Sequence, residues 1–132
     1  LSGEHPEDET VPGLLLVRVE GRIFFANAGR IGERLRELLD EHAPTAMALD
    51  MSAAPDLEYT ALSMLIQGER QMRERGVALH LVGLSPSVLA VVQRSTLGET
   101  LGHGRMHYNL QRAVRQFIAE PSLGLEPAAP TD

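Results

Sequence analysis

Two short polar segments, each placed directly after an apolar run, hold most of the side chains that could take part in chemistry. The first, residues 56–60, has the sequence Asp-Leu-Glu-Tyr-Thr, and the second, residues 83–85, has the sequence Gly-Leu-Ser. Asp56 and Glu58 could serve as an acid and a base. Two carboxylates on a loop are, however, more often turn and helix-cap residues. We therefore expect no acid–base pair in this segment.

The other catalytic motifs are incomplete. Residues 83–87 read Gly-Leu-Ser-Pro-Ser, but a nucleophile elbow needs a second Gly where Ser87 stands, and Pro86 favours the start of a helix instead. The chain contains no Lys, so a Walker phosphate-binding loop is excluded. The sequence thus predicts a protein that is not an enzyme.

The histidines offer a weak metal motif. His103 and His107 have the i, i+4 spacing that suits two metal ligands on one helix. Gly102 and Gly104 flank the first of them and disfavour a helix there, so we expect no metal and no other cofactor. His80 lies in the middle of an apolar run, and we expect it to be a core or edge histidine rather than a base.

Length and composition narrow the class of protein further. A chain of 132 residues predicts one domain, and 4% aromatic residues without Trp predict an aliphatic core. The formal net charge of −6 argues against a nucleic-acid partner. The absence of Cys excludes disulfides and thiolate metal sites and fits a cytosolic setting. No apolar run approaches the ~20 residues that span a membrane. Because the sequence starts with Leu, we expect it to be part of a longer chain.

The order of apolar runs predicts an α/β fold with a mixed sheet. Runs at 14–19 and 22–26, separated by Glu20-Gly21, predict an antiparallel hairpin. The later strands are each separated by a helix, which implies parallel pairing by crossover connections. These strands are expected at residues 46–49, 77–82 and 105–107.

About four helices are expected to flank this sheet. Their apolar residues recur at helical spacing over residues 28–41, 59–75, 86–97 and 110–120, with Asn27, Ser85 and Asn109 as N-caps for three of them. Residues 1–12 are acidic and are predicted to be a linker. The structured domain is then 13–120, followed by a disordered tail, 121–132.

The carboxyl ends of the parallel strands should bring the two polar segments together. Helices that begin near Tyr59 and Ser85 then direct their N-termini into a shared crevice, which could accept a phosphate or a nucleotide. The alternative is that Asp56, Glu58 and Ser85 cap those helices and leave no room for an anion. The crevice residues are predicted to be Asp56, Leu57, Glu58, Tyr59, Thr60, Gly83, Leu84 and Ser85.

Four segments together carry a resemblance to a known family. The segments VEGRIFFANA, ALDMSAAPDLEYTAL, ALHLVGLSPSV and RMHYNLQRAV resemble the STAS domain, specifically the STAS domain at the C-terminus of SulP-type (sulfate permease) anion transporters. The resemblance covers about residues 13–119. It implies a non-catalytic domain at the cytoplasmic face of the inner membrane that regulates a transporter of sulfate, bicarbonate or dicarboxylates. The implied partners are the transmembrane domain of the same polypeptide, a cytosolic regulatory protein or a nucleotide, and a homodimer could form through the parent transporter.

The other branch of this family, the bacterial anti-sigma factor antagonists, typically carries Asp-Ser-Ser/Thr-Gly at the start of the second helix. Here residues 58–61 read Glu-Tyr-Thr-Ala, so the phosphoacceptor position falls on Thr60 while the Asp has become Glu and the Gly has become Ala. This departure favours the transporter branch and leaves a free-standing anti-sigma factor antagonist as the alternative. We expect the Thr60 hydroxyl to bond to backbone in the first turn of its helix.

Overall fold

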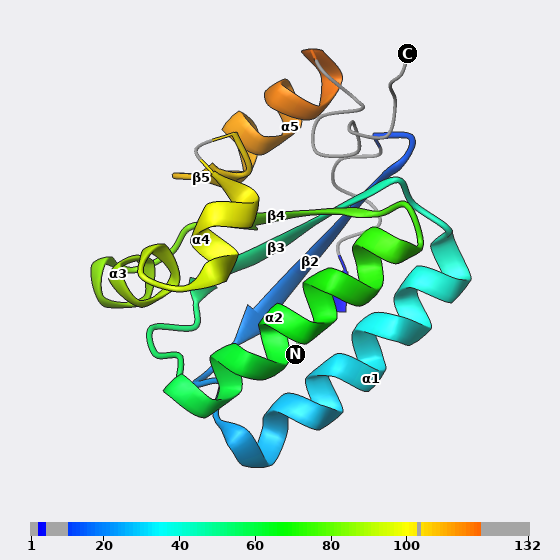
Figure 1. Cartoon of the computed structure of the whole chain (residues 1–132). Coiled ribbons are helices and arrows are strands. Elements are labelled where there is room, and N and C mark those ends of the chain that lie inside the picture. The colour runs from blue at the N-terminus through cyan, green and yellow to red at the C-terminus, as the bar shows by residue number, and fades with distance from the viewer. Residues whose placement is uncertain (1–2, 5–10, 103, 120–132) are drawn as a thin grey trace.

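The computed structural model describes residues 3–4, 11–102 and 104–119, which form one sheet with helices on both faces (Figure 1). The strands are β1 (Gly3–Glu4), β2 (Leu14–Glu20), β3 (Ala46–Ala53), β4 (Ala78–Val82) and β5 (Met106–His107). The helices are α1 (Phe25–His42), α2 (Tyr59–Glu74), α3 (Pro86–Gln93), α4 (Thr96–Leu101) and α5 (Leu110–Ala119).

The strands lie in the order β1-β2-β3-β4-β5, and β2 to β5 are all parallel. Among the described strands, one pair is antiparallel: β2 with β1, which falls within the predicted linker. Residues 1–2 and 5–10 of that linker and the predicted tail, 121–132, lie outside the described residues. The α/β class and the parallel crossovers are therefore confirmed.

The predicted antiparallel hairpin is wrong. Residues 22–26 do not form a strand: Ile23 makes one parallel bridge with Leu57, and α1 begins at Phe25. Asn27 is not the N-cap but lies one turn inside the helix, where its Oδ1 accepts from the Phe24 N–H at 3.0 Å. Its Nδ2 also donates to the Arg22 carbonyl oxygen at 2.9 Å. The short apolar run alone predicted a strand here, but these two hydrogen bonds of Asn27 stabilise the first turn of a helix instead.

The predicted helix at 86–97 is in fact two helices, so five helices rather than four occur in the described part of the chain. Ser95 separates α3 from α4, since its hydroxyl donates to the Val92 carbonyl oxygen and accepts from the Leu97 N–H. Gly98, the residue after the predicted helix, lies inside α4 and packs against this junction. A Cβ there would lie 2.7 Å from the Val92 carbonyl oxygen, which only Gly avoids.

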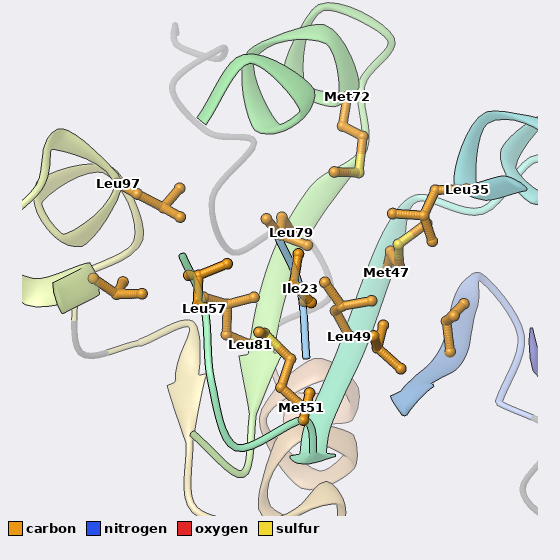
Figure 2. Packing of buried hydrophobic residues seen from close by; sticks show 14 of the residues in the cluster. Ile23, Leu35, Met47, Leu49, Met51, Leu57, Met72, Leu79, Leu81 and Leu97 are labelled. Carbon is orange, nitrogen blue, oxygen red and sulfur yellow. The ribbon is translucent and has the colours of Figure 1, made fainter. Parts of the chain in front are cut away.

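The main core lies between the sheet and helices α1 to α4 (Figure 2). Met47 and Leu49 on β3 are buried at its centre, next to Leu79 and Leu81 of β4. The cluster is almost entirely aliphatic, in line with the low aromatic content. Burial of such side chains supplies the main stabilisation of the sheet–helix packing.

Helix α5 covers the opposite face of the sheet. Asn109 caps this helix, as predicted, by accepting from the Arg112 N–H at 2.9 Å. Phe117 and Ala113 pack on small strand residues in a second, smaller core. Strand β4 is therefore buried on both faces. Among the described helices, none combines the length and apolar character that a membrane span requires.

Candidate functional site

The loop that follows β3 is fixed to the segment before α1. The Ile23 N–H donates to the Asp56 carbonyl oxygen at 3.2 Å, and the Glu58 N–H donates to the Ile23 carbonyl oxygen at 2.9 Å. Leu57 lies between them and is buried. The backbone of this loop is thus held like a short extra strand, which fixes where the side chains of residues 56 and 58 emerge.

Ser85 ties the second loop to the first. Its hydroxyl donates to the Pro55 carbonyl oxygen at 3.1 Å and accepts from the Val88 N–H at 3.3 Å, so it is the N-cap of α3 as predicted. Gly83, at φ +69°, lies against β3, where a Cβ would come within 2.8 Å of the Ser52 Cβ. The two predicted segments are therefore adjacent at the carboxyl edge of the sheet.

A cavity of about 310 Å³ opens between these loops and α3. We call it the loop cavity; it is lined by Arg22, Asp56, Leu57, Glu58, Ser87, Val88 and Val91. Three of the predicted crevice residues take part, namely those at positions 56–58. The exposed Tyr59 and Thr60, together with Gly83, Leu84 and Ser85, do not line it.

Arg22 and the α3 residues of the loop cavity were missed by sequence reasoning. The predicted hairpin places Arg22 in a strand and gives no reason to expect it opposite Asp56. Ser87 and Val91 are four residues apart in α3, and this spacing predicts that they share one face of the helix. The sequence does not show that this face lies beside the loop.

The charges at this edge are mostly paired with one another. Arg22 Nη2 lies 3.4 Å from Asp56 Oδ2, and more than half of each side chain is exposed, so this ion pair contributes little to stability. The Thr60 hydroxyl donates to Glu58 Oε1 at 3.0 Å. Our expectation that the Thr60 hydroxyl bonds to backbone is therefore wrong, because this hydroxyl donates to the side-chain carboxylate of Glu58, two residues earlier in the chain.

Glu58 occupies the N-cap position of α2, but its side chain makes no capping hydrogen bond to the helix. Of the three residues that could have capped the two helices, Ser85 does so, while Asp56 faces Arg22. The Glu58 carboxylate, held by Thr60, still lies near the positive end of the α2 dipole. An anion at that helix end would meet this negative charge.

Two histidines are buried away from the loop cavity, on the α5 side of the sheet. His80, predicted to be a core or edge histidine, has 2% of its surface exposed, and His107 has 5%. His80 Nδ1 lies 3.0 Å from His107 Nε2, and the rings stack with centroids 5.3 Å apart. Burial, the neighbouring His107 and Arg105 lower the pKa of His80 to about 4. Burial and Arg112 lower the pKa of His107 to about 4.

The suggested metal pair, His103 with His107, cannot be placed, because His103 lies outside the described residues. In the ranges that the structure describes, no cluster of three or more His, Cys, Asp or Glu side chains is arranged to hold a metal ion.

Residues 5–113, which are most of the chain, match the family described as "STAS domain". The chain belongs to the STAS domain family.

Relatives of this STAS domain include transporters that are much longer. "Sulfate transporter 3.1" of Arabidopsis thaliana is 28% identical over 142 residues, an alignment covering 94% of this chain and 22% of that protein. The chain thus spans about a fifth of the length of the curated relatives it matches.

Solved structures share the fold. A "sulfate transporter family protein" from Wolinella succinogenes is 25% identical, with a TM-score of 0.70 over 93% of this chain and 97% of that one. The "SulP transporter STAS domain" from Vibrio cholerae has a TM-score of 0.71 at 20% identity, covering 86% and 88%. The anti-sigma factor antagonist SpoIIAA has a TM-score of 0.68 at 15% identity, covering 85% and 94%. The STAS fold therefore occurs in both branches of the family, and the sequence relatives include sulfate transporters.

Proposed function

We propose that this STAS domain is the non-catalytic regulatory domain of a SulP-family secondary anion transporter that carries sulfate, bicarbonate or dicarboxylates. It acts at the cytoplasmic face of the cell membrane and contacts the transmembrane domain of the same polypeptide. The observation that carries the proposal is the 28% identity to a sulfate transporter along 94% of the chain. The altered phosphoacceptor segment, with Glu58 in place of Asp, supports the transporter branch over the anti-sigma factor antagonists.

The contact surface that we propose is the carboxyl edge of the sheet. Its exposed side chains include Tyr59, 70% exposed, and Phe24, 37% exposed, at the N-termini of α2 and α1. Their backbones are held together by the bridge between Ile23 and Leu57. Large aromatic side chains on a rigid backbone, surrounded by charges, are typical of the centres of protein interfaces. We call Arg22, Phe24, Asp56, Glu58 and Tyr59 the loop surface.

The charges of the loop cavity favour a protein partner over a nucleotide. Two carboxylates, Asp56 and Glu58, and one guanidinium, Arg22, line it. A polyphosphate would need more positive charge than one already paired guanidinium supplies. A partner protein can instead place a basic side chain against Glu58 and an apolar one against Tyr59.

Fractionation of the native cells tests the proposal. An antibody raised against the 132-residue chain should detect a polypeptide several times longer, in the membrane fraction, and deletion of its gene should lower uptake of labelled sulfate, bicarbonate or succinate. Detection of a 14.4 kDa protein in the soluble fraction, with uptake of all three anions unchanged, would contradict it.

A free-standing anti-sigma factor antagonist is the second candidate, supported by the exposed hydroxyl of Thr60 at the start of α2. It would bind a soluble kinase and be phosphorylated at Thr60. The same antibody would then precipitate a small soluble protein that carries phosphate and a bound kinase.

A further inference from the structure

A groove of about 300 Å³ lies between α1 and α2, the two helices that run side by side on one face of the sheet (Figure 1). We call it the α1–α2 groove. Its floor is apolar and includes the buried Leu35 and Met72. Below the floor a smaller apolar space of about 60 Å³ reaches Leu49 at the centre of the sheet. Exposed side chains of both helices form the rim, among them Gln67 and Gln71.

Three glycines from the middle of the two helices line this groove: Gly29 and Gly32 of α1 and Gly68 of α2. A Cβ on Gly29 or Gly68 would meet nothing within 4 Å, and a Cβ on Gly32 would meet Arg36 Nη1 at 3.9 Å. Glycine inside a helix is less stable than alanine. Because close packing within the described part of the chain does not require these glycines, they leave room for an outside group to approach both helix backbones.

The rim of the groove also carries two charges without partners. Glu33, Arg36 and Arg75 are its charged lining residues, and Arg75 Nη2 is paired with Asp40 Oδ1 at 2.6 Å. Neither Glu33 nor Arg36 forms an ion pair with a residue that the structure describes. These two side chains lie one turn apart on α1. A partner with the complementary charges therefore carries an acidic and a basic side chain at the same separation.

The shape of the groove restricts what can fill it. A second copy related by a two-fold axis would place groove against groove and enclose an empty space between them, which close packing disfavours. A helix is convex and inserts large side chains, spaced three and four residues apart, between two neighbouring helices. The same spacing places an acidic and a basic side chain one turn apart on its surface. A single helix thus matches both the shape and the charges.

We propose that the α1–α2 groove binds an amphipathic helix of a partner protein. Large apolar side chains of this helix pack over Leu35 and Met72, where the glycines let its backbone come close. An acidic side chain pairs with Arg36 and a basic one with Glu33. None of the residues of the loop surface lines the groove, so the two surfaces are separate. The inference does not depend on attachment to a transporter.

Selection from a displayed library of random 16-residue peptides, with the 132-residue chain as the target, tests this proposal. The selected peptides are the probes, and their Kd is measured by fluorescence anisotropy. We expect apolar residues at helical spacing, an acidic and a basic residue one turn apart, and a Kd on the order of 10 μM. Peptides of this length are barely helical alone, so circular dichroism should show helix gained on binding.

Variants that fill the groove give the second readout. Gly68→Leu should weaken binding at least tenfold, whereas Ser63→Leu, which is exposed on α2 outside the groove, should leave the Kd unchanged. Gly68→Ala should raise the melting temperature of the domain and yet weaken binding, a combination that lost folding does not produce.

A charge exchange tests the expected chemistry of the partner. Arg36→Glu should weaken binding at least tenfold, and a peptide whose acidic residue is replaced by Lys should bind this variant more tightly than the original chain. Arg34→Glu is the control, because the exposed Arg34 pairs with Glu37 and does not line the groove.

Four outcomes would overturn the proposal. These are a selection that yields no binding peptide, equal binding to the two Leu variants, peptides that stay non-helical when bound, and no effect of the charge exchange. Sedimentation of the chain alone adds one more test. Dimers that form at high concentration and are abolished by Gly68→Leu would assign the groove to a second copy and would contradict a partner helix.

Discussion

Thr60 and Glu58 are joined by a hydrogen bond in which the Thr60 hydroxyl donates to Glu58 Oε1 over 3.0 Å. The resemblance predicts that Thr60 occupies the phosphoacceptor position of the anti-sigma factor antagonists. In this chain the hydroxyl at that position donates to a carboxylate. A phosphate would add a charge of about −1.5 to −2 beside that carboxylate. This repulsion opposes the favourable effect of the helix N-terminus and argues for a structural hydroxyl.

Thr60→Val tests this structural role. Both partners of the hydrogen bond are exposed, so its loss should change the free energy of unfolding by no more than about 0.5 kcal/mol. Urea denaturation measures the difference. Thr60→Glu, a mimic of the phosphate, should likewise leave anion uptake by the proposed parent transporter unchanged. Loss or gain of uptake in that variant would show that this position acts as a switch.

Ser85 should matter more for stability than its neighbour Ser87. Ser85→Ala removes both the cap of α3 and the bond to the Pro55 carbonyl oxygen, which should cost about 1–2 kcal/mol. Ser87→Ala is the matched control, because the hydroxyl of Ser87 contacts only that of Ser85 among the described residues. It should change stability by less than about 0.5 kcal/mol. Equal losses would contradict the assignment of the link between the loops to Ser85.

Two glycines should respond to the same substitution with opposite signs. Gly98→Ala places a Cβ 2.7 Å from the Val92 carbonyl oxygen and should cost about 1–3 kcal/mol, since backbone must move. Gly68→Ala, within α2, meets nothing within 4 Å and should stabilise the helix by roughly 0.5–1 kcal/mol. Thermal unfolding of the two variants measures the difference. A stabilised Gly98 variant would exclude the close junction between α3 and α4.

The buried histidine pair should make the domain sensitive to acid. Each pKa is lowered to about 4 in the folded state, so between about pH 6.5 and 4 the unfolded chain binds more protons. The contribution is fully present above pH 6.5 and is lost as the pH falls toward 4. Replacing both rings, His80→Leu with His107→Leu, should reduce the loss of stability between pH 7 and 4.5 by about 2–5 kcal/mol. An unchanged loss in urea titrations at the two pH values would exclude this role.

The sequence predicted correctly those helix boundaries that depend on contacts between residues close together in the chain. Ser85 followed by Pro86 marked the start of α3 correctly because capping depends on the next three residues. The hairpin prediction failed because a run as short as Ile23-Phe24 fits a strand or a helix start. The bonds of Asn27 decide that choice only once the loop after β3 is in place.

Contacts between distant segments were not readable from the sequence. The loop cavity depends on Arg22 lying opposite Asp56, which are 34 residues apart, and the histidine pair joins residues 27 apart. Both depend on which strands are neighbours and in which register. The sequence indicated residues 56–58 of the loop cavity but neither Arg22 nor the residues of α3. The parallel order of β2, β3 and β4 brings these segments to the same edge of the sheet.

The proposed regulation of transport by the loop surface is tested most directly by uptake measurements. Labelled sulfate, bicarbonate and succinate are given to cells that express the proposed parent transporter. The variant Phe24→Ser with Tyr59→Ser removes the two aromatic side chains of the loop surface, and Ile118→Ser on α5, 62% exposed, is the control for loss of an exposed apolar group. At equal amounts of protein in the membrane, the double variant should change the uptake rate at least threefold, about 0.7 kcal/mol, while the control stays at the unmodified rate. Equal rates in all three proteins would contradict the account.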